Sequence, residues 1–120
     1  LYDTLYHSIA FVGINTTSMI DAIALGKPVI ALYTKQYEEM QLGTFHFRAL
    51  YQEEALDLVD TENQKDSLYR VLSGLIDGKD ERREKREAFI RRYIRPRGLE
   101  VSAGRAILDE IEKLIQVKNA

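Results

Sequence analysis

Short apolar runs alternate with helical periodicity along the first half of the chain. Apolar residues fill positions 9–12 and 28–33, and the segment between them carries a stripe at helical spacing, formed by Met19, Ile20, Ile23 and Ala24. An apolar run without alternation is typical of a strand buried on both faces, as in a parallel sheet. The pattern therefore predicts strands at 9–12 and 28–33 around a helix at 16–25, with the two strands parallel.

The ends of the predicted helix carry ordinary boundary residues. Asn15 or Thr16 is a natural N-cap because either side chain can accept a hydrogen bond from the first turn. Gly26 is a natural stop, and Pro28 is tolerated at the beginning of the strand that follows.

The middle of the chain gives a weaker signal. Residues 34–52 hold scattered aromatic residues and are broken by Gly43, which predicts a loop followed by a short helix. Residues 55–59 alternate in polarity, which favours a third strand at a sheet edge with one wetter face.

The last half of the chain, residues 60–120, is predicted to be mainly helical. The TENQ string at 61–64 fits a capping box, and an apolar stripe at helical spacing then ends at Gly78. A second helix is predicted at 80–94, and its charged beginning, DERREKRE, fits a solvated helix face. Ser102 is placed to cap a final helix whose stripe consists of Ile107, Ile111, Leu114 and Ile115.

Composition narrows the class of protein. With 120 residues, 45% of them hydrophobic and 30% charged, the chain has the make-up of one globular domain with one core. The net charge of -2 gives no basic footprint for nucleic acid, and no apolar run approaches the roughly 18 residues of a membrane span. The absence of cysteine excludes disulfides and thiolate chemistry, and the acidic and histidine residues form no ligand pattern for a metal. We therefore expect an α/β domain, a Rossmann-like half domain with a short parallel sheet of about three strands, flanking helices and a helical C-terminal tail.

The turn between the first strand and the first helix holds the candidate chemistry. Ligands of open parallel sheets bind beyond the carboxyl ends of the strands, and a helix start suits a phosphate. Asn15, Thr16, Thr17 and Ser18 are small polar residues at such a place. Asp21 follows one turn later, where a carboxylate can accept hydrogen bonds from a ribose diol. An ordinary N-cap followed by a solvated aspartate explains the same residues, so both interpretations remain open at this point.

Two strings in this region resemble a known superfamily. GINTTSMIDA at 13–22 and ALGKPVI at 24–30 resemble the C-terminal donor-binding domain of GT-B glycosyltransferases and of the related UDP-N-acetylglucosamine 2-epimerases. FIRRYIRPRG at 89–98, followed by a long last helix, is similar to the closing helices of surface-polysaccharide and teichoic-acid-type transferases. The chain departs from the pattern by having Thr-Thr where a glycine is usual and aspartate where glutamate is commoner.

The resemblance implies specific roles for residues of this sequence. The turn at Asn15, Thr16, Thr17 and Ser18 would hold the diphosphate of a nucleotide donor, and Asp21 would bind the ribose hydroxyls. Gly13, Gly43, Thr44 and His46 are second-tier binding candidates, because in the resembling enzymes the loop after the middle strand approaches the donor. The catalytic residues stay unknown, because the acceptor side of such enzymes belongs to another domain.

The implied function is binding of a nucleotide-activated donor, as a substrate and without a cofactor or metal, in a glycosyltransferase of cell-surface polysaccharide biosynthesis. A nucleotide-sugar 2-epimerase fragment and a non-catalytic α/β interaction module are the alternatives. The protein would be cytoplasmic, at most peripheral at the inner face of a membrane.

The resemblance also covers only half of such an enzyme. We expect the chain to be part of a longer protein whose N-terminal acceptor domain is missing here, and to be inactive as a transferase alone. In the intact sheet the strand at 9–12 would be central, so its outer edge should be covered by residues 1–7 or by a second copy in a homodimer.

Overall fold

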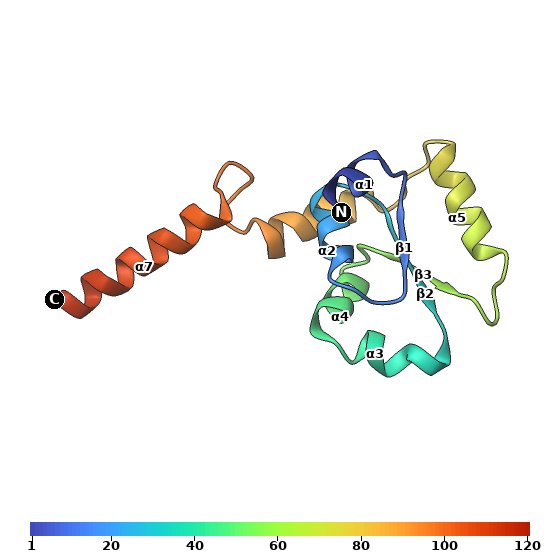
Figure 1. Cartoon of the computed structure of the whole chain (residues 1–120), viewed down its shortest axis with the longest axis horizontal. Coiled ribbons are helices and arrows are strands. Elements are labelled where there is room, and N and C mark those ends of the chain that lie inside the picture. Colours follow the sequence, from blue (N-terminus) through green and yellow to red (C-terminus); the bar gives the residue numbers. More distant parts are fainter.

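The computed structural model describes residues 1–120 and has an α/β architecture around a small parallel sheet. The three strands are β1 (Phe11–Gly13), β2 (Val29–Tyr33) and β3 (Asp57–Asp60), in the spatial order β1-β2-β3. Both pairings are parallel, with Val12 opposite Ile30 and Ala31 opposite Leu58. The predicted fold class is therefore confirmed, and the carboxyl ends of all three strands lie at one edge of the sheet (Figure 1).

Helices connect and flank the strands. α2 (Ser18–Ala24) joins β1 to β2, and α3 (Glu38–Leu42) and α4 (Phe45–Gln52) join β2 to β3. The remaining elements are α1 (Tyr2–His7), a single 3-10 turn η1 (Lys35–Tyr37), α5 (Ser67–Ile76), α6 (Arg83–Phe89), a π-helical turn η2 (Ile90–Ile94) and α7 (Ala103–Asn119).

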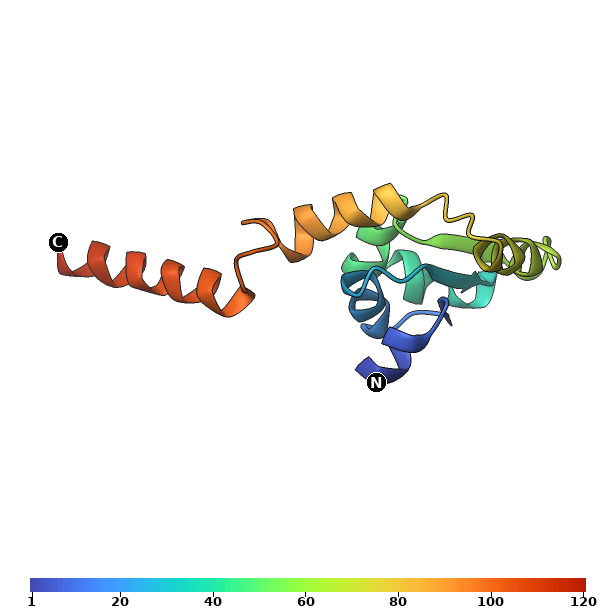
Figure 2. The same ribbon diagram turned by 90° about the horizontal axis from the view of Figure 1, so that it is seen from above.

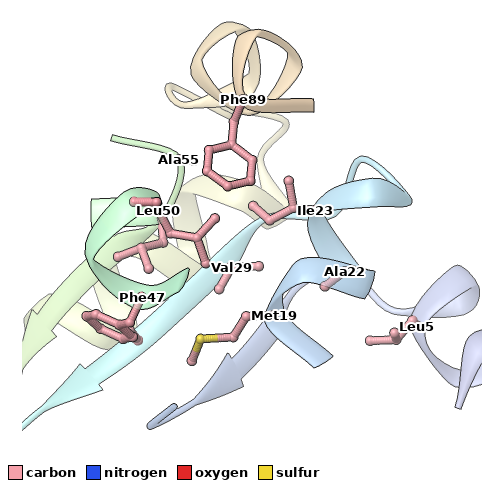
Figure 3. Close-up of a cluster of buried hydrophobic side chains, with 12 residues drawn as sticks. Leu5, Met19, Ala22, Ile23, Val29, Phe47, Leu50, Ala55 and Phe89 are labelled. Atoms are coloured by element: carbon pink, nitrogen blue, oxygen red, sulfur yellow. The ribbon is translucent and has the colours of Figure 1, made fainter. Parts of the chain in front are cut away.

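The hydrophobic core lies on the sheet face covered by the crossover helices (Figure 3). Met19 and Ile23 of α2 and Phe47 and Leu50 of α4 pack there with Val29 of β2, and all five side chains are buried. Phe89 of α6 closes the same cluster from above. Crossovers of one hand between successive adjacent strands place their helices on the same face, which accounts for a single main core.

The strand boundaries differ from those predicted. β1 begins two residues later than expected and includes Gly13, and β3 begins at Asp57 although the apolar signal begins at Ala55. Ala55 and Leu56 are buried without being part of the strand, because they enter the core just before the chain reaches the sheet. Burial, which the pattern detects, therefore begins before strand pairing does.

The segment between β2 and β3 is more helical than predicted. Residues 34–52 form η1, α3 and α4 where a loop and one short helix were expected. Gly43 separates α3 from α4, and a Cβ atom at this position would lie 2.2 Å from the backbone oxygen of Glu39. The chain leaves the helical conformation at the next residue, Thr44, whose backbone is extended, and this splits one helical stretch into two helices.

The predicted capping box at 61–64 is wrong. Thr61 donates a hydrogen bond to the Tyr33 carbonyl oxygen instead of capping a helix. The carboxylate of Asp60 accepts from the backbone N–H groups of Glu62 and Asn63, and α5 begins only at Ser67. Asp60 forms this tight turn because its side chain can mimic a backbone acceptor.

The charged run at 80–87 is only partly solvated, contrary to the prediction. Arg86 is buried and bonded to the carboxylate of Asp80, and Arg82 bonds to Asp57 of β3 at 2.6 Å. The helix predicted over 80–94 is also divided, into α6 and the π-helical turn η2. Arg82 thereby ties the beginning of α6 to β3, whereas Arg86 bonds to the segment just before its own helix.

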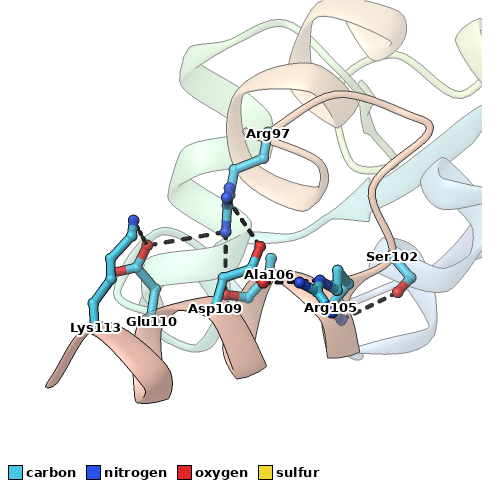
Figure 4. A network of polar contacts seen from close by, with 7 residues as sticks. All are labelled: Arg97, Ser102, Arg105, Ala106, Asp109, Glu110 and Lys113. Carbon is cyan, nitrogen blue, oxygen red and sulfur yellow. Dashed lines mark hydrogen bonds and ion pairs between the residues drawn. The ribbon is translucent and has the colours of Figure 1, made fainter. Parts of the chain in front are cut away.

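α7 projects from the body as a separate arm (Figures 1 and 2). Ser102 caps it as predicted, accepting from the backbone N–H of Arg105 at 3.1 Å. Arg97 in the preceding loop donates to the Ala106 carbonyl oxygen and pairs with Asp109 at 3.2 Å (Figure 4). Lys113 bonds to Glu110 at 2.8 Å and thereby lowers the pKa of that carboxyl. No residue of α7 is buried, and the apolar stripe of the helix faces solvent.

β1 occupies an edge of the sheet, and β2 takes the centre. Val29, Ile30 and Ala31 of β2 are completely buried, whereas Val12 of β1 is exposed. α1 packs against α2 through the buried Leu5 rather than extending the sheet. No helix in the chain combines the length and the apolar composition that crossing a membrane requires.

Candidate functional site

The carboxyl ends of β1 and β2 are joined by one buried side chain. The amide nitrogen of Gln41 donates to the carbonyl oxygens of Ile14 at 2.7 Å and of Leu32 at 2.9 Å. Gln41 is completely buried, and its amide oxygen has no partner. This residue therefore fixes the separation of the two strand ends around which the candidate site is built.

The turn after β1 holds backbone donors without a partner. Phe11 N donates to the carbonyl oxygen of Pro28. In a parallel pair this pattern repeats every two residues along both strands, so its continuation would bring Asn15 N to Leu32 O. In the structure Leu32 O accepts from the side chain of Gln41. The backbone N–H groups of Asn15, Thr16 and Thr17 donate no hydrogen bond within the chain.

The beginning of α2 differs from the expected geometry. The N-cap is Thr17, and no side chain caps the helix, although Asn15 or Thr16 was predicted to do so. The Thr16 hydroxyl accepts from Ser18 N at 3.2 Å, and Met19 N and Ile20 N bond to carbonyl oxygens of the turn. The free donors thus lie in the loop before the helix, whereas the backbone N–H groups of the first helical turn already have acceptors.

Asn15 does not cap the helix because its side chain is used across the site. Its Nδ2 donates to the carbonyl oxygen of Met40 at 2.5 Å and to the hydroxyl of Thr44 at 3.1 Å. Its Oδ1 lies 2.8 Å from Nε2 of His46. Thr44 in turn donates to the Gln41 carbonyl oxygen at 2.9 Å, so the turn after β1 is bonded to the beginning of α4.

The structure therefore brings together Asn15 with two of the second-tier candidates, Thr44 and His46. All three side chains are partly buried, which leaves them accessible from solvent. Gly43 immediately precedes Thr44, and its missing side chain permits the close approach to Glu39 O described above. Gly13 ends β1, and a Cβ there would lie 2.8 Å from the ring of Phe11.

The other candidates lie in the loop before α2 and in its first turn. Thr16 and Thr17 are exposed, and Ser18 and Asp21 are partly buried. The carboxylate of Asp21 makes no hydrogen bond or ion pair within the chain, although ten ion pairs form elsewhere. A carboxylate of this kind retains its full capacity to accept hydrogen bonds.

Carboxylates and a tyrosine surround the ends of β2 and β3. Tyr33 stands opposite Asp60 in the register. Partial burial raises the pKa of Tyr33, and the nearby carboxylates of Glu38, Asp60 and Glu62 raise it further. Hydrogen bonds from Asn63 and Glu62 hold the pKa of Asp60 below its usual value. The β3 end of this edge is thus negative, and the unpaired donors are concentrated at the β1 end.

Sequence reasoning missed Gln41 and the carbonyl group of Met40. Both belong to α3, in the stretch predicted as a loop, and neither has a pattern that marks it as functional. His7, on the other hand, contacts the Tyr6 ring in α1 and does not take part in the cluster. Nowhere in the chain do three or more histidine or acidic side chains gather closely enough to hold a metal ion.

Comparisons of the chain with protein-family models, with curated proteins and with solved structures found no match.

Proposed function

We propose that this chain is the donor-nucleotide-binding part of a GT-B-type glycosyltransferase acting in cell-surface polysaccharide biosynthesis. The observation that carries the proposal is the meeting of two segments at the carboxyl edge of the sheet. The turn at Asn15–Ser18 approaches the beginning of α4, where Thr44 and His46 are bonded to Asn15. Such an edge is where open parallel α/β sheets bind their ligands.

The diphosphate is assigned to the loop donors. Three consecutive residues, Asn15, Thr16 and Thr17, present backbone N–H groups without a partner, and the exposed threonines add hydroxyl donors. Successive free N–H groups form a favourable setting for an anion. The phosphates of the donor would therefore lie against the loop rather than against the first turn of α2.

The ribose is assigned to Asp21, which stands one turn into α2. Its carboxylate has no partner in the chain and can accept both hydroxyl hydrogens of a vicinal diol. Phosphates at the loop and ribose along the helix together describe a nucleoside diphosphate that lies across the end of β1.

The reaction would transfer a sugar, or a glycerol phosphate in the teichoic-acid branch, from the activated donor. We expect the acceptor side and the catalytic base to come from a domain that this chain does not contain, so the chain alone should bind the donor without turning it over. The outer edge of β1, which pairs with no strand in this chain, is the place where a second copy could add in a homodimer.

The test is a nucleotide titration of the ¹⁵N-labelled chain. UDP, CDP and GDP are added separately, and amide shifts are followed at Gly13–Ser18 and in α4. Saturable shifts at both places with at least one nucleotide are expected. If all three nucleotides leave these amides unmoved, the alternative of a non-catalytic interaction module replaces the proposal.

The matched control is a change of charge away from the site. Asp77→Ala removes an exposed carboxylate just past the end of α5 and should leave the nucleotide affinity unchanged. Asp21→Ala should weaken it, so equal losses in the two variants would point to a general charge effect.

A further inference from the structure

His46 is held through only one of its ring nitrogens. Nε2 lies 2.8 Å from Oδ1 of Asn15, and this is the only hydrogen bond that the ring makes within the chain. His46 stands in the first turn of α4, and Asn15 stands in the turn after β1, 31 residues away in sequence. The chemistry of this contact decides what the other ring nitrogen can do.

The orientation of the Asn15 amide is fixed by its other partners. The Met40 carbonyl oxygen can only accept a hydrogen bond, so the atom 2.5 Å from it must be the amide nitrogen. The Thr44 hydroxyl donates its hydrogen to Gln41 O, so it too accepts from Asn15 Nδ2. Oδ1 of Asn15 therefore faces His46.

The tautomer of His46 follows from this orientation. An amide oxygen has no hydrogen to give, so Nε2 of His46 must carry one. In the neutral ring the second nitrogen, Nδ1, is then without a hydrogen and can only accept. Nδ1 has no partner in the chain and is not completely buried, so it is free to accept a hydrogen bond.

We propose that Asn15 is a positioning residue that holds His46 as the Nε2–H tautomer, so that Nδ1 accepts a hydrogen bond from a hydroxyl group of the bound nucleotide-activated donor. A phosphate oxygen is itself an acceptor and cannot bond to an acceptor nitrogen, whereas the loop N–H groups suit it. The identity of the ligand rests on the proposed function, but the tautomer rests on the geometry alone.

The first experiment reads the tautomer directly. ¹⁵N NMR of the imidazole nitrogens is recorded on the full chain at about pH 8, where a free imidazole is neutral. We expect Nε2 of His46 to carry the hydrogen and Nδ1 to have none. A mixture of tautomers, or an Nδ1–H ring, in the unmodified chain would overturn the proposal.

A variant of Asn15 separates positioning from general structure. Asn15→Leu removes the acceptor, and the ring should then show both tautomers. Asp77→Ala, at an exposed position just past the end of α5, is the control and should leave the ring signals unmoved. If Asn15→Leu unfolds the chain, the unmodified chain still decides, because an Nδ1–H ring there contradicts the assignment.

The second experiment adds ligands to the same labelled chain. UDP-N-acetylglucosamine or CDP-glycerol should shift the Nδ1 resonance of His46 while Nδ1 stays without a hydrogen, and inorganic pyrophosphate should not protonate it. Protonation of Nδ1 by pyrophosphate would make His46 a phosphate ligand and overturn the proposal.

The outcomes distinguish the role of His46 from the proposed function. If a nucleotide shifts the amides of Asn15–Ser18 but leaves Nδ1 unmoved, the role of His46 fails and the proposed function stands. If no nucleotide shifts either set of signals, the proposed function fails, and with it the hydroxyl ligand.

Discussion

Arg86 lies with only 2% of its side chain exposed, and its guanidinium is bonded to the carboxylate of Asp80, of which 27% is exposed. The Nε atom of Arg86 is buried without a partner. A single carboxylate, that of the partly exposed Asp80, therefore compensates the charge of this buried arginine.

The asymmetry of this pair predicts unequal effects of substitution. Asp80→Ala leaves a buried charge uncompensated and should destabilise the fold by about 3–5 kcal/mol. The double variant Asp80→Ala with Arg86→Met replaces the charge by an apolar chain of similar length, so it should be more stable than Asp80→Ala alone. Urea unfolding of the variants measures both, and equal stability of the single and double variants would contradict the argument.

Gly43 should not tolerate a side chain. A Cβ there would meet the backbone oxygen of Glu39 at 2.2 Å, so Gly43→Ala should cost about 1–3 kcal/mol through crowding. It should also shift the NMR signals of Thr44 and His46, which follow the turn. Gly104→Ala is the control: nothing lies within 4 Å of its Cβ position, and alanine favours the helix, so stability should stay equal or rise. Thermal unfolding compares the two.

Asp60 should titrate below an ordinary aspartate. The side-chain amide of Asn63 is the main cause of the lowered pKa, followed by backbone N–H groups of Asn63 and Glu62. Because the folded pKa lies below the unfolded value of about 3.9, the stabilisation is complete above that value and is lost as the pH falls through the folded pKa. Asn63→Ala should raise the pKa of Asp60, as measured by NMR titration of its carboxyl carbon. An unchanged pKa of Asp60 would show that the hydrogen bond from the Asn63 side chain does not lower it.

Asp21→Ala should weaken nucleotide binding by about 1–3 kcal/mol, the range for hydrogen bonds that involve a charge. Isothermal titration calorimetry with the nucleotide that binds best measures the loss. The unmodified chain should also prefer ribonucleotides to their 2′,3′-dideoxy forms. Equal affinity for the two forms would exclude Asp21 as the ribose ligand even if the variant binds weakly.

Removal of α7 should leave the body intact. No residue of α7 is buried, and its polar contacts outside the helix are with Arg97 and Ser102 in the preceding loop. A chain ending at Ser102 should therefore unfold with a free energy within about 0.5 kcal/mol of the whole chain. Denaturation followed by circular dichroism tests this. A large loss of stability would mean that the apolar stripe of α7 packs against the body in solution.

The sequence by itself determined the class and order of the elements. Unbroken apolar runs marked β1 and β2 because Val29 and Ala31 of β2 belong to the core and Phe11 of β1 packs against it, and the spacing between the runs placed α2 correctly. Ser102 capped α7 as predicted, and Gly26 and Gly78, both with positive φ, follow the ends of α2 and α5. These features depend on residues within a few positions of one another, so local patterns record them.

The tertiary structure decided which side chains meet. Asn15 reads as a helix cap in the sequence, but its side chain bonds to Met40, Thr44 and His46, which lie 25 to 31 residues further along. Arg86 reads as part of a solvated run, but the packing of α6 on the core buries it. Polar contacts of this kind depend on how the elements come together in space. Hydrophobic periodicity records only which face of an element is buried, and it does not identify the hydrogen-bond partners of the polar side chains.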